Sequence, residues 1–232
     1  MLYASTNSMN MKNAIVLLSG GMDSAVTLYL AKKEYMCRAL IFDYGQKAKT
    51  EIGYAKKLAE TAGVPYEISN ITMPWKGSSL LDSAVSVPDA SSGGQDDIPN
   101  TYVPARNMIF LSFGVSFAEA TGAEAVFIGA HQMDFSNYPD CRDVFFKALQ
   151  GAIDKGTREG ILGKGIKIVT PIIDKRKEEI VRIGSKLGVP FEHTWSCYRD
   201  GAAPCGKCES CLFRMNAFEK AGIKEQVLSI KL

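Results

Sequence analysis

The sequence predicts an α/β fold in which one doubly wound, mostly parallel, five-stranded sheet carries helices on both faces. Three observations lead to this prediction. Short apolar runs rich in β-branched residues recur along the chain, as expected of strands buried on both faces. Segments with helical spacing separate these runs, and glycine follows several of the segments as a stop signal. Strands that alternate with helices in this way indicate a parallel sheet.

The expected elements follow one another in a regular order. The strands are expected at residues 14–18, 38–43, 66–71, 125–130 and 166–173. The helices are expected at residues 25–33, 47–62, 106–121, 143–155 and 175–187. In the second helix, Ile52, Ala55 and Leu58 recur at helical spacing, and Gly63 follows the last apolar residue.

Composition and charge are those of an ordinary globular chain of 232 residues, with 46% hydrophobic and 22% charged residues. We expect one domain over residues 11–232, in which residues 189–232 form a metal-bound extension. The net charge of +2 and the lack of a long basic run argue against binding of long nucleic acid. No apolar run suits a membrane span and no secretory signal is visible, so a cytoplasmic location is expected.

Two stretches stand outside the alternating pattern. Residues 1–10 are interpreted as a leader, an expression remnant or the result of a misassigned start. Residues 72–100 are rich in proline, serine and glycine. A loop of this length in a compact domain is usually functional or disordered, so we expect either a lid over the substrate or partial disorder.

The turn between the first strand and the first helix has the sequence SGGMDS, at residues 19–24. Its glycines allow close backbone approach, and the first helical N–H groups carry partial positive charge, so the turn suits phosphate binding. It lacks the Gly-Lys-Ser/Thr ending of a Walker A loop and the spaced glycines of a dinucleotide fingerprint. The alternative is a tight turn in which Asp23 or Ser24 caps the helix.

Three other strand-to-helix connections carry candidate ligand contacts. Asp43 and Tyr44 end the second strand, where ligands of parallel sheets bind, although an ordinary turn is the alternative. Arg106 begins an apolar helix, where its charge opposes the helix dipole, so a bound anion would explain it better than a solvated loop would. Lys177 lies in the first turn of the last expected helix and could reach a phosphate or merely face solvent.

The connection at residues 129–142 is dense in hydrogen-bonding side chains. Such a loop can bind a planar polar ring, with Asp134 and Asp140 accepting from the N–H groups of a guanine-like base. The alternative is a polar surface loop. A nucleophilic pair of Cys141 with a histidine is the weakest hypothesis, because closeness in sequence is poor evidence of pairing.

Four cysteines, Cys197, Cys205, Cys208 and Cys211, follow the spacing C-x7-C-x2-C-x2-C. Four thiolates suit one tetrahedral structural zinc ion per chain, since a closed shell leaves no open position for catalysis. An iron–sulfur cluster also uses four thiolates and is the competing interpretation. Nearby Arg199, Lys207 and Arg214 are expected to offset the thiolate charge.

The turn at residues 19–24 resembles the SGGxDS signature of the PP-loop ATP pyrophosphatases. Together with FDYGQK, YVPARN, YPDCR, TPIIDKRKEEI and the four cysteines, it resembles the 7-cyano-7-deazaguanine synthase family of queuosine biosynthesis, from about Asn13 to the end. The resemblance implies an adenine nucleotide alpha hydrolase-like fold. It implies ATP-dependent conversion of 7-carboxy-7-deazaguanine and ammonia to the nitrile, with Mg²⁺ on the phosphates, ammonium as donor, no direct contact with nucleic acid, and a homodimer.

The resemblance also implies roles for particular residues. Asp23, Ser24 and Lys177 would be catalytic. Contacts to ATP would come from Leu18, Ser19, Gly20, Gly21, Met22, Asp23, Ser24, Asp43, Tyr44 and Arg106. Contacts to the deazaguanine would come from Asp134, Tyr138, Asp140 and Arg142.

Two rival functions belong to other classes. A PP-loop tRNA-modifying enzyme would need a broad basic surface or an RNA-binding domain, and neither is evident in the sequence. A nucleotide-gated zinc protein that binds nucleic acid or a partner would need exposed aromatic and basic residues beside the cysteines. Trp195, Tyr198 and Phe213 leave that second rival open.

Overall fold

A computed structural model describes residues 11–90, 98–132 and 138–225 of the chain. Its five strands are all parallel and lie in the order β3-β2-β1-β4-β5. They are β1 (Lys12–Leu17), β2 (Tyr35–Asp43), β3 (Tyr66–Asn70), β4 (Ala125–Ile128) and β5 (Lys167–Val169). The predicted fold class is confirmed.

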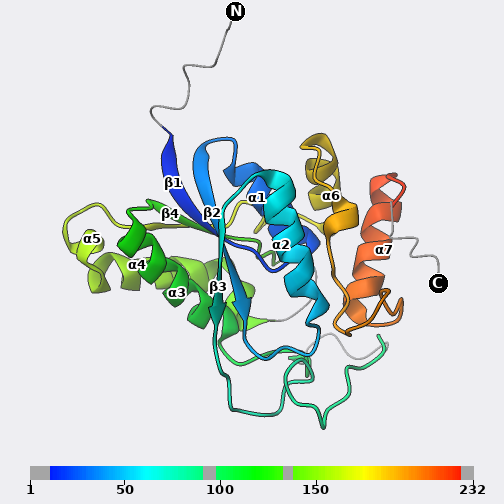
Figure 1. Cartoon of the computed structure of the whole chain (residues 1–232). Helices are drawn as coiled ribbons and strands as arrows, with labels where there is room; N and C mark the ends of the chain where they lie inside the picture. Colours follow the sequence, from blue (N-terminus) through cyan, green and yellow to red (C-terminus); the bar gives the residue numbers. More distant parts are fainter. Residues whose placement is uncertain (1–10, 91–97, 133–137, 226–232) are drawn as a thin grey trace, which may run out of the picture.

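Helices cover both faces of this sheet (Figure 1). On one face lie α1 (Met22–Ala31), α2 (Thr50–Ala62), α6 (Lys177–Lys186) and α7 (Glu209–Ala221). On the other lie α3 (Arg106–Thr121) and α4 (Asp143–Gly156), followed by the short α5 (Arg158–Ile161). Two short 3₁₀ turns, η1 (Pro139–Cys141) and η2 (Phe191–His193), complete the described elements.

The alternation of side chains along β1 gives each face its own core. Ala14 and Val16 pack with α1, α2 and α6, whereas Ile15 and Leu17 pack with α3. All four are at most 6% exposed, because a central parallel strand is covered on both sides. Phe218 of α7 joins the first core, so the C-terminal helix is part of the packed body. The proposed boundary of an extension at residue 189 stays a prediction.

The predicted elements differ from the observed ones mainly at their ends. The strand predicted at 166–173 was too long: β5 ends at Val169, because Pro171 has no N–H for the ladder and Ile173 N–H turns back to Thr170 O at 3.2 Å. Helix α2 begins at Thr50, where Asp200 accepts its N–H at 2.9 Å. The helix predicted at 106–121 has those bounds, and Gly122 ends it in the left-handed conformation (φ 71°).

The described part of the long connection after β3 contains neither helix nor strand, but it packs on the body. Leu80 and Val87 are buried, and Lys47 N–H donates to Leu80 O at 2.9 Å. A lid function for this connection stays a prediction, and residues 91–97 lie outside the described ranges. Within the described ranges, no helix combines the length and apolar character needed to cross a membrane.

Candidate active site

A cavity of about 280 Å³ opens at the carboxyl ends of the central strands. Leu18 follows β1, Tyr44 follows β2 and Gly129 follows β4, and all three line it. The starts of α1, α2 and α3 also line it, through Asp23, Glu51 and Arg106 among others. This is the edge of a parallel sheet where ligands bind, as predicted from the order of strands and helices.

The turn before α1 leaves the helix without a side-chain cap. Gly21 is the N-cap residue, and no side chain bonds to the first helical N–H groups. The Ser24 hydroxyl lies 3.1 Å from the Ser19 hydroxyl and donates to Gly21 O at 3.0 Å. The alternative in which Asp23 or Ser24 caps the helix is therefore not what forms. The uncapped N–H groups are suited to an anion.

Two glycines permit this turn to pack tightly. Gly20 has a φ of 87°, and a Cβ there would lie 2.3 Å from Glu51 O, in the first turn of α2. Gly129 faces the start of α1, and a Cβ there would lie 2.8 Å from Asp23 O. Neither backbone can move aside, so both positions require glycine.

Asp23 is the centre of a charged group at the mouth of α1. Lys177 Nζ lies 2.6 Å from its Oδ2, and His131 Nε2 lies 3.6 Å from the same oxygen. Burial would raise the pKa of Asp23, but Lys177 and His131 outweigh burial and lower it. The other carboxylate oxygen, Oδ1, is buried and has no hydrogen-bond partner among the described residues. A buried acceptor of this kind suits a cation bound together with phosphate.

A second polar group lies where α2 and α3 begin. Arg106 donates to the Tyr44 hydroxyl at 3.2 Å, and its guanidinium lies 5.8 Å from the centre of the Tyr44 ring. Glu51 accepts from Gln46 Nε2 at 3.1 Å. Burial raises the pKa of Glu51 to about 7, although Arg106 and Gln46 oppose the shift. The cavity therefore holds a fixed cation beside a carboxyl group that titrates near neutral pH.

The four predicted substrate residues take different places. Tyr138 lines the cavity, and its hydroxyl lies 2.6 Å from Thr101 Oγ1. Asp140 is buried outside the lining and accepts from Asn107 N–H at 2.9 Å, so its carboxylate holds the start of α3. Arg142 is exposed and precedes α4. Asp134 lies outside the described residues. Substrate contacts by these residues stay predictions.

Asp43 is also drawn away from the cavity. Its Oδ1 forms an ion pair with Lys49 and accepts from Gly45 N–H at 3.3 Å. The hydrogen bond from Lys49 lowers the pKa of Asp43. Asp43 lines a neighbouring hollow that it shares with Tyr44 and Trp75. Tyr44 lies between the two and lines both.

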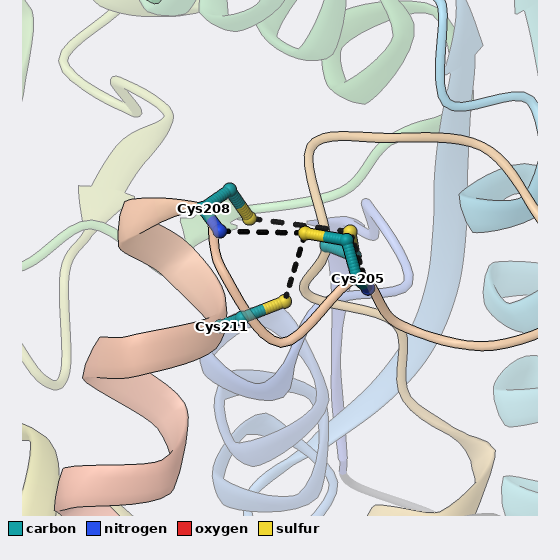
Figure 2. A group of neighbouring side chains, drawn as sticks. Cys205, Cys208 and Cys211 are labelled. Carbon is teal, nitrogen blue, oxygen red and sulfur yellow. Dashed lines mark hydrogen bonds between the residues drawn. The ribbon is translucent and has the colours of Figure 1, made fainter. Parts of the chain in front are cut away.

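The cysteine thiols gather as predicted. The four sulfur atoms of Cys197, Cys205, Cys208 and Cys211 all lie within 4.8 Å of one another. Two of the Sγ–Sγ distances, Cys197–Cys208 and Cys205–Cys211, are 3.9 Å. A tetrahedron with metal–sulfur bonds of about 2.3 Å has edges of about 3.8 Å, so the group fits one metal ion. Figure 2 shows three of these thiols converging at the start of α7.

Backbone N–H groups point at the sulfur atoms. Cys197 Sγ accepts from Arg199 N–H at 3.3 Å, and Cys205 Sγ accepts from Cys208 N–H at 3.3 Å. Such contacts stabilise thiolates without any charged side chain. Arg214 was expected to offset the thiolate charge, but that expectation is not met by its contacts. Its guanidinium instead donates to Thr194 Oγ1 at 2.6 Å and also lines the cavity.

The chain around the cysteines forms one wall of the cavity. The backbone N–H of Trp195 donates to Gly20 O at 2.8 Å, which ties this wall to the turn before α1. Residues near the cysteines that line the cavity are Trp195, Ser196, Tyr198, Ser210, Phe213 and Arg214. Arg199 also pairs with Asp89 at 2.6 Å, so the connection after β3 is fastened to the same wall.

Comparison with known proteins decides the family. The family model described as "Queuosine biosynthesis protein QueC" matches residues 13–222. The chain belongs to the QueC family. A relative from Leptospira interrogans, named 7-cyano-7-deazaguanine synthase, is 47% identical over 95% of this chain and 92% of its own. One of the same name from Trichodesmium erythraeum is 45% identical over 93% of this chain and 99% of its own.

Solved structures of lower similarity also match this QueC-family chain. NMN synthetase from Francisella tularensis is 16% identical, with a TM-score of 0.47, covering 94% of this chain and 80% of its own. A U34-tRNA thiolase from Methanococcus maripaludis is 16% identical, with a TM-score of 0.45, covering 93% of this chain and 67% of its own.

Sequence reasoning missed several residues that line the cavity of this QueC-family chain, Glu51, Gln46 and Arg214 among them. Glu51 looked like an ordinary acidic residue in the first turn of a helix, which the helix dipole favours. Gln46 entered the sequence analysis only as part of the motif FDYGQK, and Arg214 only as a basic residue near the cysteines. Their places in the cavity depend on side-chain hydrogen bonds to Phe42 O and Phe191 O, which the sequence does not reveal. The suggested nucleophile Cys141 is disfavoured, because burial raises the pKa of its thiol to about 11.

Proposed function

We propose that this chain is a 7-cyano-7-deazaguanine synthase, which converts 7-carboxy-7-deazaguanine, ammonia and ATP to the nitrile. The observation that carries the proposal is its similarity to relatives of that name over more than nine-tenths of both chains. The cavity supports it, because one space contains a turn suited to phosphate, a fixed cation and aromatic walls.

The chemistry requires activation of a poor electrophile. A carboxylate resists ammonia because oxide is a poor leaving group, and transfer of its oxygen to a nucleotidyl or phosphoryl group of ATP makes an activated acyl species. Ammonia then gives the amide, and a second activation of the amide oxygen allows it to leave as the nitrile forms. The protein contributes positioning and charge stabilisation.

The phosphates of ATP would lie at the turn formed by residues 18–24, over the uncapped start of α1. Lys177, paired with Asp23 at 2.6 Å, can turn to a phosphate oxygen as charge develops there. Asp23 Oδ1, buried and without a partner among the described residues, would hold Mg²⁺. When bound, Mg²⁺ neutralises the charge on the phosphates.

Arg106, which the resemblance assigns to ATP, would instead hold the carboxylate of the deazaguanine. Its guanidinium is fixed by Tyr44, and a planar cation of this kind binds carboxylates with two hydrogen bonds. The Tyr138 ring packs near Tyr102, with 5.9 Å between ring centres, and could extend that stack onto the substrate ring.

The four cysteines would hold one structural zinc ion. A single ion explains sulfur atoms that all lie within 4.8 Å of one another, whereas an iron–sulfur cluster distributes four cysteines over two or four irons and so spreads the sulfurs. The ion would supply folding energy to the wall that contacts Gly20. Free ammonium as nitrogen donor, a cytoplasmic location, a homodimer and no direct contact with nucleic acid belong to the same proposal.

A direct assay tests the function. Purified, zinc-loaded protein with saturating ATP, Mg²⁺, ammonium and 7-carboxy-7-deazaguanine should yield the nitrile by mass spectrometry. Omission of ATP or of ammonium should abolish the nitrile. No nitrile from the complete mixture would overturn the proposal.

A further inference from the structure

Glu51 is one of two carboxyl groups that line the cavity within the described residues, the other being that of Asp23. The two are in different situations. Asp23 is held by Lys177 at 2.6 Å, whereas Glu51 Oε1 accepts from a neutral amide, Gln46 Nε2, at 3.1 Å. No described residue donates a hydrogen bond to the second oxygen of Glu51. This carboxyl group is therefore oriented but not neutralised by an ion pair.

Gln46 fixes that orientation. Its side-chain oxygen accepts from Tyr44 N–H at 2.8 Å, so its Nε2 must be the donor to Phe42 O at 3.1 Å and to Glu51. Gln46 is only 3% exposed, and reversing the amide would break all three bonds. The backbone of Glu51 is fixed as well, because its carbonyl packs against Gly20 of the turn before α1 (residues 19–24, the phosphate turn).

Burial and the charges around Glu51 bring its pKa close to neutral pH. Burial raises its pKa to about 7, and Asp200 adds to the rise. Arg106 from α3 and Lys49 from the turn before α2 act in the opposite sense, together with the hydrogen bond from Gln46. A base with a pKa near the working pH is the most effective proton acceptor.

Other titratable groups on the cavity wall suit this role less well. Burial raises the pKa of the Tyr44 hydroxyl to about 12 and that of the Cys141 thiol to about 11, so both stay protonated. Asp23 is a weak base, since Lys177 and His131 lower its pKa against the effect of burial. His131 Nε2 lies 3.6 Å from Asp23 Oδ2, so this histidine is paired with the other carboxyl group of the cavity.

We propose that Glu51 is the general base that takes protons from the incoming nitrogen, an inference that rests on the proposed function. The nitrogen lone pair of ammonia forms the C–N bond at the activated acyl carbon. The C–O bond to the nucleotidyl or phosphoryl group breaks, and its electron pair leaves with that group. The proton released from nitrogen goes to the Glu51 carboxylate, which leaves the neutral amide.

The same group would serve the second half of the reaction. After the amide oxygen is activated by ATP, two N–H protons must leave while the C–O bond breaks and the C≡N bond forms. Glu51 would accept these protons in turn and pass each to solvent. The initial activation of the carboxylate releases no proton from nitrogen, so it does not require Glu51.

The test compares Glu51→Gln with wild type in two assays. The first is single-turnover cleavage of ATP that depends on 7-carboxy-7-deazaguanine, without ammonium. The second is kcat for the nitrile at saturating substrates between pH 6 and 9. We expect the first to stay within about 3-fold of wild type and the second to fall about 10²–10⁴-fold. In wild type kcat should fall below about pH 7, and this dependence should disappear in Glu51→Gln.

The controls keep the inference falsifiable. Glu60→Gln, on the exposed side of α2, should match wild type in both assays. Glu51→Asp keeps a carboxylate and should retain the acidic fall in kcat with an intermediate rate. The inference is overturned by an unchanged kcat in Glu51→Gln, by an increase in KM alone, or by loss of the ammonium-independent cleavage. Absence of nitrile from wild type would instead overturn the proposed function.

Discussion

Lys177 and Asp23 are 154 positions apart in the sequence, and yet Lys177 Nζ lies 2.6 Å from Asp23 Oδ2. The pair joins the start of α6 to the start of α1, at the turn suited to phosphate. A lysine held in this way is aimed before ATP arrives, so little side-chain entropy is lost on binding. The pair also brings the first and last strand-to-helix connections into one site.

Loss of the Asp23 carboxylate should stop turnover without unfolding the chain. Asp23→Asn keeps the size of the side chain but removes the charge of the carboxylate that is proposed to hold Mg²⁺, so kcat/KM for ATP should fall at least about 10²-fold. Steady-state kinetics and circular dichroism together check this. The control Asp174→Asn removes an exposed carboxylate just before α6, the helix that begins with Lys177, and should leave the kinetics unchanged. Asp23→Asn with activity within 3-fold of wild type would refute the phosphate-site assignment.

Alanine should be tolerated at Gly53 in α2 but not at Gly20 in the turn before α1. Gly20→Ala places a Cβ 2.3 Å from Glu51 O at a φ of 87°, so it should destabilise the fold by about 1–3 kcal/mol and abolish ATP binding. Gly53→Ala, in α2 with no atom within 4 Å of the new Cβ, should stabilise by about 0.5–1 kcal/mol. Urea unfolding of both variants measures the difference. Equal changes in the free energy of unfolding for the two variants would contradict the close approach of α2 to Gly20.

Removal of the metal should affect the cavity as well as the cysteines. Elemental analysis should find about one zinc per chain. Cys205→Ser should lower the zinc content and the melting temperature, and it should shift the fluorescence of Trp195, whose indole N–H donates to Cys197 O at 2.9 Å. Cys37→Ser changes a cysteine outside the cluster and should keep its zinc. Substantial iron in the purified protein would contradict the zinc assignment.

Glu51 should make the fold less stable at alkaline pH. Its pKa in the folded chain is raised to about 7 by burial, so folding favours the protonated form, and that contribution is lost as the pH rises through 7. Glu51→Gln should therefore raise the free energy of unfolding by about 1–3 kcal/mol at pH 8.5. The gain should shrink toward pH 5. A gain that is the same at both pH values, or a Glu60→Gln control with an equal gain, would argue against a raised pKa.

The sequence allowed the fold to be predicted because local signals agreed with one another. Strong apolar runs, regular helical spacing and glycine at helix ends each arise within one short segment, as at Gly122. The error at residues 170–173 has the same origin. Ile172 and Ile173 continue an apolar run, but Pro171 turns the chain and leaves Ile172 buried outside the sheet.

The site was only partly predictable, because several of its contacts form between distant segments. The turn at residues 19–24 and the four cysteines carry their chemistry in adjacent letters. In contrast, the hydrogen bond from Asn107 N–H to the Asp140 carboxylate joins residues 33 positions apart and was not expected from the sequence, while substrate contact by Asp140 stays a prediction. Glu51 enters the cavity through the close approach of α2 to Gly20, and Arg214 is held beside it by Phe191 and Thr194, contacts that local patterns do not encode.

The most direct test of the central claim follows the nitrogen atom. Purified protein, ATP, Mg²⁺ and 7-carboxy-7-deazaguanine are incubated with ¹⁵N-ammonium, and the product is analysed by mass spectrometry beside an Asp23→Asn control. We predict a nitrile that carries one ¹⁵N atom, formed only with ATP and at least about 10²-fold more slowly by Asp23→Asn. An unchanged carboxylic acid in the wild-type reaction, or a product without the label, would contradict the assignment.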